Sequence, residues 1–412
     1  MKRRDISFSP PDMSDMEIGE VIKTLRSGWI TTGPRTKEFE DQIASYIGVE
    51  KAVCLSSATS AMELALRILE VGPGDEVITS AYTYTASAAV IDHVGAKIIF
   101  ADTGKDSFEL DYEQLGSLIT ERTKVILPVD IGGKICDYEA IYRIIEEKKS
   151  LFKAKGTLQS KLGRICVLED AAHAFGSVWK GKMCGQIADI TCFSFHAVKN
   201  LTTAEGGAVV WRNDIGISDS AMYKKFMLYS LHGQTKDASE KMSKGAWEYD
   251  IAFPGYKCNM TDIMAAIGIA QLSRFDGLLE RRSEIFKKYD EALLPLGIHR
   301  LEHSGKDFKT NAHLYMVWIP GINEQIRNEI IAQMAEAGVS TNVHFKPLPM
   351  FTGYKELGFD IKNYPNAFRM YAGEITLPMH TLLSNEDVDY VKEMFRTVLA
   401  PYKDAIAAGN HA

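Results

Sequence analysis

The sequence predicts an α/β protein, with a large domain built on a mostly parallel seven-stranded sheet and a smaller α+β domain at its C-terminal end. Seven short apolar runs alternate with helix-like stretches in the first half of the chain, a pattern typical of strands that pair in parallel. After residue 211 the strand signals become sparse, and helices mix with short strands from about residue 283 onward. We therefore expect a large domain of residues 1–260 and a smaller one of residues 261–412.

The N-terminal helices are predicted from their capping residues and their apolar spacing. Residues 14–27 begin with a capping box, Ser14 and Glu17, and end before Gly28. One face of this amphipathic helix carries Ile18, Val21, Ile22 and Leu25. A second helix, over residues 36–47, repeats the scheme and ends before Gly48.

The predicted strands are short apolar runs with helix-like segments between most of them. They cover residues 52–55, 76–78, 97–100, 124–127, 164–168, 189–193 and 208–211. In open α/β sheets, ligands bind beyond the carboxyl ends of the strands. Candidate functional residues are therefore expected where these runs end.

The remaining segments are predicted with less regular structure. Residues 229–258 form a polar, glycine-rich excursion, residues 261–282 form a helix, and a capped helix over 384–399 ends before Pro401. The basic segment 148–164 is interpreted as a solvated loop, and contact with an anionic ligand is the alternative.

Composition disfavours nucleic-acid binding and membrane insertion. The 412 residues carry a formal net charge of -7, whereas binding to duplex nucleic acid requires a basic face. No run approaches the length of about 18 apolar residues needed for a membrane span. No apolar segment follows the basic residues at positions 2–4, so no signal peptide is expected.

The six cysteines form no CxxC pair and show no spacing typical of metal ligands, so no metal site is expected. Several lie in apolar strand-like runs, among them Cys54 and Cys166. Buried, reduced thiols are typical of cytoplasmic proteins. We therefore expect a cytoplasmic location.

Lys199 is the candidate for covalent chemistry. It lies just beyond the predicted strand 189–193 and is followed by the pair Gly206 and Gly207. A lysine at the mouth of an apolar strand loses hydration, which lowers the pKa of its amine and allows it to form a Schiff base. Because a lone lysine is more often a solvated surface charge, this interpretation depends on its neighbours.

Small hydroxyl residues connect the predicted strand 52–55 to a helix over residues 61–69. Free N–H groups and the dipole at a helix N-terminus bind phosphate, and Thr59 and Ser60 lie at this junction. Ser60 and Glu63 also form a capping pair, so helix capping alone would explain the hydroxyl residues. Ser194 could add a further hydroxyl to the phosphate.

Asp170 lies at the end of an apolar strand, where a carboxylate needs a positive or hydrogen-bonding partner. A protonated pyridine nitrogen would be such a partner, and a structural ion pair is the alternative. Tyr82 or Tyr84 offers a flat face for a ring, unless both pack in the core. Together with Lys199 and a phosphate site, these residues suggest pyridoxal 5′-phosphate (PLP) as the cofactor.

These residues lie in segments that resemble the DegT/DnrJ/StrS family of PLP-dependent sugar-nucleotide aminotransferases over nearly the whole chain. The similar segments are SGWITTGP at 27–34, SSATS at 56–60, GDEVI at 74–78, EDAAH at 169–173, SFHAVK at 194–199 with EGG at 205–207, GYKCNMTD at 255–262 and LP at 377–378. The resemblance implies the PLP-dependent transferase fold type I and a homodimer with active sites at the subunit interface.

The resemblance also implies a role for each matching residue. Lys199 corresponds to the lysine that binds PLP and shuttles the proton, and Asp170 to the partner of the pyridine nitrogen. Tyr84 falls where an aromatic residue stacks on the ring, and His173 falls near the cofactor hydroxyl. The implied phosphate-binding positions are Thr59, Ser60, Ser194 and, from the other subunit, Asn259. The implied substrate-facing residues are Trp29, Thr31 and His344.

Lysine at position 199 favours transamination, because relatives with histidine there catalyse dehydration or deoxygenation. We expect transfer of an amino group from L-glutamate to a keto-sugar nucleotide, with a UDP- or dTDP-4-keto-hexose favoured, in the synthesis of amino sugars for surface polysaccharide or related glycans. The alternatives are a PLP-dependent sugar-nucleotide dehydratase and a non-catalytic PLP-binding protein.

Two departures from the family pattern concern the substrate. Relatives often carry histidine in the segment that here reads VDIGG at 129–133, and many carry histidine where this chain has Pro349. Both positions are expected where the sugar binds, so they leave the identity of the sugar and the nucleotide open. The basic segment 148–164 also looks longer than in relatives.

Overall fold

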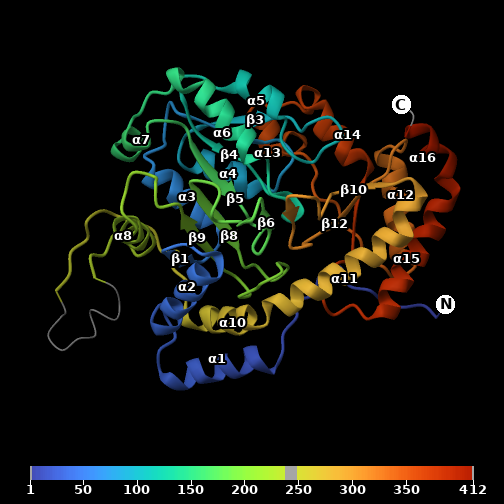
Figure 1. Ribbon diagram of the computed structural model, residues 1–412, viewed down its shortest axis with the longest axis horizontal. Coiled ribbons are helices and arrows are strands. Elements are labelled where there is room, and N and C mark those ends of the chain that lie inside the picture. Colours follow the sequence, from blue (N-terminus) through green and yellow to red (C-terminus); the bar gives the residue numbers. More distant parts are fainter. Residues whose placement is uncertain (1, 237–247, 411–412) are drawn as a thin grey trace.

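A computed structural model describes residues 2–236 and 248–410 and contains a central sheet of seven strands in these residues (Figure 1). The strands are β1 (Ala52–Leu55), β2 (Glu76–Ser80), β3 (Lys97–Ala101), β4 (Thr123–Leu127), β5 (Cys166–Asp170), β8 (Ile190–Ser194) and β9 (Gly207–Trp211). They are ordered β1-β9-β8-β5-β4-β2-β3. Among these seven, only β9 runs antiparallel to its neighbours, so the predicted seven-stranded, mostly parallel sheet is confirmed.

Helices cover both faces of the sheet, because alternate side chains of each strand point to opposite faces. In β1, Val53 and Leu55 belong to one apolar core, and Ala52 and Cys54 belong to the other. The first core contains α3 (Ala58–Ile68), α4 (Thr85–His93) and α8 (Asp219–Ser230). The second contains α2 (Pro34–Ile47), α5 (Tyr112–Leu118), α6 (Tyr138–Glu147) and α10 (Asp262–Ser273).

The predicted bounds of β5 were wrong by two residues. The strand begins at Cys166 rather than at residue 164, and it ends with Asp170. The pairing of β5 with β4 begins at Cys166, opposite Val125, and Arg164 lies before it, where its guanidinium forms an ion pair with the buried Asp189 carboxylate at 2.7 Å. The shift places Asp170 at the carboxyl end of the strand itself.

The first helix, α1 (Asp15–Ser27), has the predicted capping box of Ser14 and Glu17. It buries Glu17 and Thr24, whereas the apolar side chains that share a face in the sequence are exposed, with Ile18 at 55% and Leu25 at 53%. Glu17 is buried because its carboxylate accepts hydrogen bonds from Arg274 at 2.7 Å and Gln271 at 2.8 Å. In this chain α1 therefore turns an apolar stripe outward.

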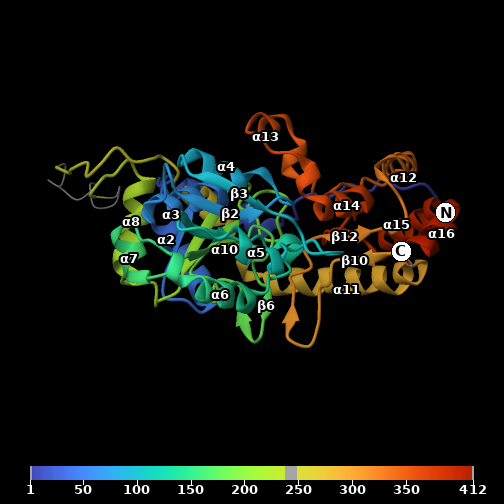
Figure 2. The same cartoon turned by 90° about the horizontal axis from the view of Figure 1, so that it is seen from above.

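The helix predicted over residues 261–282 is two helices. α10 (Asp262–Ser273) ends at Arg274, and α11 (Phe275–Leu293) follows it. The chain bends at Arg274, whose guanidinium binds Asp12 at 3.0 Å and Glu17 at 2.7 Å. α10 packs against α1 and α2, and α11 runs from the sheet into the C-terminal part of the chain (Figures 1 and 2).

The C-terminal part has the predicted α+β character. Its antiparallel sheet consists of β10 (His299–Arg300), β12 (Tyr315–Trp318) and β13 (Glu374–Leu377), with β12 in the middle. An apolar core of its own joins this sheet to α11, α12 (Glu324–Glu336), α15 (Asn385–Leu399) and α16 (Lys403–Gly409). Ile6 belongs to the same core, because the N-terminal segment pairs with Val339. The domain boundary at residues 260/261 stays a prediction.

The remaining elements are short. α13 (Thr352–Glu356) stands out from the molecule in Figure 2, and α14 (Pro365–Gly373) precedes β13. A small sheet joins β6 (Val178–Trp179), β7 (Lys182–Met183) and β11 (Phe308–Lys309). Across the parts of the chain that the structure describes, no helix has the length and apolar character needed to cross a bilayer.

Two segments, residues 148–164 and 229–258, were predicted to be irregular, and the structure describes them differently. The interpretation of 148–164 as a solvated loop is wrong in part, because α7 (Thr157–Leu162) buries Leu158 and Gln159. The Gln159 amide donates to the Leu69 carbonyl at 2.6 Å, which anchors the segment to the large domain. Of the excursion 229–258, residues 237–247 lie outside the described residues, and the described part after α8 contains only isolated bridges, such as Leu231 with Lys257.

Candidate active site

A cavity of about 500 Å³ lies at the carboxyl ends of the central strands. Segments that follow β1, β2, β4, β5 and β8 line it, and residues 313–314 and 342–345 of the C-terminal part complete its wall. This is the position at which an open α/β sheet binds ligands. Lys199, Asp170, Thr59, Tyr84, His173, Ser194 and His344 all line this cavity, so the fold brings together most of the predicted site residues.

Lys199 lies in a tight turn after β8, where its N–H donates to the His196 carbonyl at 2.9 Å. The next residue holds this turn to the C-terminal part, because the Asn200 amide donates to the Asn311 carbonyl at 2.7 Å. Burial lowers the pKa of Lys199 to about 8, and the nearby Asp170 carboxylate opposes this shift. A substantial fraction of the amine is therefore neutral near that pH, as nucleophilic attack requires.

Asp170 is the last residue of β5, and only 4% of it is exposed. Its carboxylate accepts hydrogen bonds from the Ser87 hydroxyl at 2.7 Å and from the Ala172 N–H at 3.1 Å. Burial raises the pKa of Asp170, although both hydrogen bonds and Lys199 oppose the rise. A cationic partner in the cavity, such as a protonated ring nitrogen, would stabilise the buried carboxylate further.

The N-terminus of α3 forms another wall of the cavity. Ser57 caps the helix by accepting from the Ser60 N–H at 3.0 Å, and Ser57, Ala58 and Thr59 line the cavity. The predicted capping pair of Ser60 and Glu63 is wrong, because Ser60 pairs with Ser57 and Glu63 binds Arg67 at 2.8 Å. The Ser60 hydroxyl is used within the cap, where it donates to the Ser57 carbonyl at 2.8 Å.

Gly207 explains why the glycine pair follows the lysine segment. A Cβ atom at this position would lie 2.4 Å from the Ser57 carbonyl carbon and 2.5 Å from the Ala58 nitrogen. Glycine is therefore required for β9 to lie directly against the N-terminus of α3. Ser194 lies opposite Gly207 in the sheet and lines the same cavity.

Aromatic residues form the side walls. Tyr84 lies at the start of α4 and is 62% exposed in this chain, with its ring 6.1 Å from that of Phe345. Tyr82, the other candidate, is buried and donates its hydroxyl to the His344 carbonyl at 2.9 Å. Of the two tyrosines, only Tyr84 lines the cavity.

His173 is the buried imidazole next to the predicted ring site. Burial lowers its pKa well below the ordinary value, so the ring is neutral. The Gly132 N–H donates to Nδ1 at 3.1 Å, which leaves the ring proton on Nε2. His173 therefore presents a fixed hydrogen-bond donor.

The residues in this cavity fit PLP. The α3 N-terminus with its hydroxyl residues suits the phosphate, a buried carboxylate suits the ring nitrogen, and a lysine with a lowered pKa suits the aldehyde carbon. All three groups lie in one cavity, so a single cofactor can contact them together.

Four predicted site residues do not line the cavity of their own chain: Ser60, whose hydroxyl is used in the α3 cap, and Trp29, Thr31 and Asn259. Trp29 donates its indole N–H to the Thr32 carbonyl at 3.1 Å, and Asn259 donates to the Thr32 hydroxyl at 2.5 Å. Thr31 is exposed beside them. The structure thus groups Trp29, Thr31 and Asn259 in one patch, and their roles at the cofactor or substrate stay predictions.

Several lining residues come from distant segments and were not predicted from the sequence. His313 lies 4.5 Å from His173 between ring centroids, and its Nδ1 is 2.9 Å from the Asn200 amide oxygen. Phe8, from the N-terminal segment, stacks on His344 at 5.7 Å. Neither residue follows a strand of the central sheet, so the search at strand ends could not find them.

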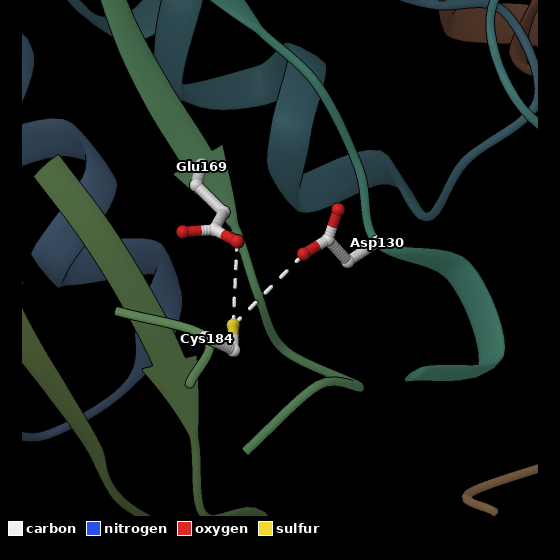
Figure 3. A group of neighbouring side chains, drawn as sticks. All are labelled: Asp130, Glu169 and Cys184. Atoms are coloured by element: carbon white, nitrogen blue, oxygen red, sulfur yellow. Dashed lines mark hydrogen bonds between the residues drawn. The ribbon is translucent and has the colours of Figure 1, made fainter. Parts of the chain in front are cut away.

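The segment 129–133, which departs from the family pattern, meets the cavity through Val129 and not through the Asp130 side chain. Val129 lines the cavity, whereas the Asp130 side chain is fully buried and points toward Glu169 and Cys184 (Figure 3). The Pro349 position is also buried, next to Leu348, whose N–H donates to the Ala81 carbonyl at 2.9 Å. Neither the Asp130 nor the Pro349 side chain lines the cavity, and the expectation that these segments meet the sugar stays a prediction.

Asp130, Glu169 and Cys184 place potential metal-ligand atoms within 4.8 Å of one another. Their polar atoms are already hydrogen-bonded, since Cys184 donates to Glu169 at 3.3 Å and Thr191 donates to Glu169 at 2.5 Å. Burial and the Glu169 carboxylate raise the pKa of Asp130 well above its ordinary range. A proton held on Asp130 beside Glu169 thus accounts for the close approach of these two buried side chains.

Comparison with known proteins agrees with this geometry. Residues 11–396 match the DegT/DnrJ/EryC1/StrS aminotransferase family. The chain is 37% identical to the spore coat polysaccharide biosynthesis protein SpsC of Bacillus subtilis, over 96% of this chain and 97% of that protein. It is 36% identical to the UDP-4-amino-4-deoxy-L-arabinose–oxoglutarate aminotransferase of Shewanella sediminis, over 91% and 89% of the two chains.

A solved structure is similar over nearly the full length. The candidate sugar aminotransferase Spr1654 of Streptococcus pneumoniae, in its pyridoxamine phosphate form, is 52% identical with a TM-score of 0.94, covering 98% of this chain and 100% of that one. The same protein has also been solved in its PLP form, with a TM-score of 0.93. The chain belongs to the DegT/DnrJ/EryC1/StrS aminotransferase family and is a PLP-dependent sugar aminotransferase.

Proposed function

We propose that this enzyme transfers the amino group of L-glutamate to the keto carbon of a UDP- or dTDP-linked 4-keto sugar, for the synthesis of surface polysaccharide or a related glycan. The observation that carries the proposal is the meeting of Lys199, Asp170 and the α3 N-terminus in one cavity. The relative from Shewanella sediminis supports a UDP-linked 4-amino sugar and an oxoglutarate-linked donor, and SpsC supports a role in polysaccharide synthesis.

Lys199 is the group that we assign to move the proton. When bound, PLP supplies an electron sink that stabilises negative charge on the carbon attached to the transferred nitrogen. The Lys199 Nζ atom, with its pKa lowered to about 8, is suited to take the proton from that carbon of the donor and to give it back later.

Other residues of the cavity hold the reacting groups in place. Asp170, oriented by Ser87 and Ala172, is assigned to keep the ring nitrogen protonated. The free N–H groups at the start of α3 and the Thr59 and Ser194 hydroxyls are assigned to the phosphate. Tyr84 is assigned to one face of the ring.

A homodimer with shared active sites is part of the proposal. It is supported by the exposed apolar stripe of Ile18, Ile22 and Leu25 on α1, since large exposed apolar patches mark interaction surfaces. The patch of Trp29, Thr31 and Asn259, outside the cavity of its own chain, would then contribute to the site of the second subunit. A cytoplasmic location is supported by six free cysteines.

The test is to incubate the purified enzyme with L-glutamate and each member of a panel of UDP-, dTDP- and GDP-linked keto sugars. We expect 2-oxoglutarate and an aminated sugar in equal amounts, together with reversible conversion of bound PLP to pyridoxamine phosphate, followed by absorbance. The largest kcat/KM is expected for a UDP- or dTDP-linked 4-keto sugar.

The other possible outcomes identify the alternatives. Loss of a sugar hydroxyl with no nitrogen transferred would indicate a dehydratase. No spectral change with glutamate, alanine or glutamine would indicate a non-catalytic PLP-binding protein. Either result would contradict the proposed function.

A further inference from the structure

We propose that Glu374, acting through the Thr376 hydroxyl, sets which ring nitrogen of His344 carries the proton, so that the Nε2 edge facing the cavity alternates between hydrogen-bond acceptor and donor. Glu374 is thus a positioning residue that stores one proton for the site. The use of this edge by a bound sugar or amino acid rests on the proposed function, whereas the proton relay itself does not.

The His344 ring is held at one face, at one edge and at Nδ1. Phe8 stacks on it with centroids 5.7 Å apart and planes 21° apart, and Phe345 meets it edge-on at 5.0 Å. Its Nδ1 lies 2.9 Å from the Thr376 hydroxyl. Among the described residues, Nε2 has no protein partner and is not a buried unsatisfied atom, so it is accessible from the cavity that His344 lines.

The relay continues through β13 to Glu374. The Thr376 hydroxyl donates to Glu374 Oε1 at 2.5 Å, and the His344 main-chain N–H donates to Glu374 Oε2 at 2.8 Å. Thr376 and Glu374 are both fully buried. With the carboxylate ionised, the donors therefore run from Nδ1–H of His344 to Thr376 and from Thr376 to Glu374, which leaves a lone pair on Nε2.

Protonation reverses this chain of donors without charging the imidazole. A proton that enters at Nε2 releases the Nδ1 proton to the Thr376 oxygen, and the Thr376 proton passes to Glu374 Oε1. One N–H bond forms and one breaks at His344, one O–H bond forms and one breaks at Thr376, and Glu374 becomes a neutral acid. His344 is neutral in both states, with its proton on Nδ1 in one and on Nε2 in the other.

The charges around the relay favour storage on Glu374 rather than on the ring. Burial raises the pKa of Glu374 to about 8, although Thr376, the His344 N–H and the Arg327 guanidinium oppose the rise. Burial and Lys199 lower the pKa of His344 to about 3, so an imidazolium is disfavoured. The other titratable groups facing this region are the Tyr82 hydroxyl, which lies close to Glu374, and the neutral His173 and His313 rings near His344.

The test follows the His344 ring nitrogens by nitrogen-15 NMR in the histidine-labelled holoenzyme, with the resonances assigned by His344→Asn. In the wild type, we expect Nδ1 and Nε2 to exchange protonated and unprotonated chemical shifts as pH rises, with a midpoint near 8. The pH dependence of activity alone would not distinguish Glu374 from Lys199, because the pKa of the free Lys199 amine is also about 8.

Two matched substitutions at Thr376 separate the relay from a packing effect. Thr376→Ser keeps the hydroxyl and should keep the pH-dependent exchange, whereas the isosteric Thr376→Val should abolish it. Glu374→Gln should hold Nε2 protonated at every pH, because its amide can donate to Thr376 while its oxygen accepts from the His344 N–H. His303, a buried histidine bonded to Thr310, is the internal control, since its shifts should be the same in all variants.

Wild-type ring shifts that do not change over this pH range would overturn the proposal, and so would a Thr376→Val protein that titrates like the wild type. If the valine protein does not fold, as judged by thermal unfolding and bound PLP, Thr376→Ser and Glu374→Gln decide the question. If none of the keto-sugar nucleotides were aminated, the NMR spectra would still show or exclude the relay, so the two proposals can fail separately.

Discussion

At the scale of single residues, burial determines the chemistry of the site. Lys199 and Asp170 are both removed from water, which lowers the pKa of the amine and raises the pKa of the carboxylate. Their mutual attraction opposes both shifts. The pair is therefore ready to accept a ligand that carries both an electrophilic carbon and a basic ring nitrogen.

The first prediction concerns Lys199. Lys199→Ala should remove the absorbance band of protein-linked PLP and lower kcat/KM by about 10³-fold or more, because no other amine takes its place as proton carrier. Lys182→Ala, at an exposed lysine on β7, is the control and should behave like the wild type. Near wild-type turnover in the Lys199 variant would exclude the assignment.

The second prediction concerns the pH dependence of stability. Glu40 is buried, accepts from the Cys54 N–H at 2.9 Å and from the Tyr223 hydroxyl at 2.8 Å, and has a pKa raised to about 7 by burial. The pKa of Glu40 is 4.5 in the unfolded chain and about 7 in the native state, so between these pH values the native state binds more protons. The contribution of Glu40 to the free energy of unfolding therefore falls as the pH rises through this window.

Glu40→Gln should remove this pH-dependent loss of stability, since the glutamine amide stays neutral at every pH. Denaturant unfolding at several pH values should show that the wild type loses up to about 3 kcal/mol relative to the variant between about pH 4.5 and pH 8. The control is Glu38→Gln, at an exposed position of the same helix. Parallel pH curves for wild type and the Glu40 variant would contradict the prediction.

At the scale of elements, the site depends on how closely β9 approaches the N-terminus of α3. Gly207 allows this approach, because any Cβ atom would overlap the backbone of Ser57 and Ala58. Those backbone N–H groups are the ones assigned to the phosphate. A strand without catalytic side chains therefore fixes the position of the anion site.

The third prediction tests this contact. Gly207→Ala should displace the start of α3, lower the free energy of unfolding by about 1–3 kcal/mol and weaken PLP binding by about tenfold or more. Gly277→Ala in α11, where a Cβ atom meets nothing within 4 Å, is the matched control. It should leave PLP affinity unchanged and keep or slightly raise stability. Equal PLP affinities in the two variants, measured by titration of the apoenzyme, would refute the argument.

At the scale of the whole molecule, the exposed stripe of α1 is the feature that one chain does not explain. The helix buries Glu17 and Thr24 and exposes Ile18, Ile22 and Leu25. Tyr84, at the mouth of the cavity, is exposed as well. A second copy that covers these side chains would complete both the apolar surface and the site.

The fourth prediction is that Ile18→Glu combined with Leu25→Glu converts the proposed dimer into monomers, because charged residues cannot be buried at such an interface without partners. Sedimentation velocity would measure the change in mass. We expect kcat/KM to fall together with the dimer fraction. Lys23→Ala, at an exposed position of the same helix, is the control and should stay dimeric. A fully active monomer would contradict shared active sites.

The sequence by itself determined the features that depend on local pattern. Apolar runs of the right length predicted the seven strands, and their carboxyl ends located Lys199, Asp170, Thr59 and Ser194 at one edge of a sheet. This succeeds because the side chains after parallel strands must lie together. Capping signals placed α1 and α15 correctly for the same local reason.

The tertiary structure decided what depends on contacts between distant segments. It placed Phe8, His313 and the Glu374–Thr376 pair around His344, directed Asp130 away from the cavity, and turned the apolar face of α1 outward. No local pattern encodes these outcomes, because each is set by partners distant in the sequence or, as we propose for α1, by a second chain. Burial by those partners sets the pKa values on which the chemistry depends.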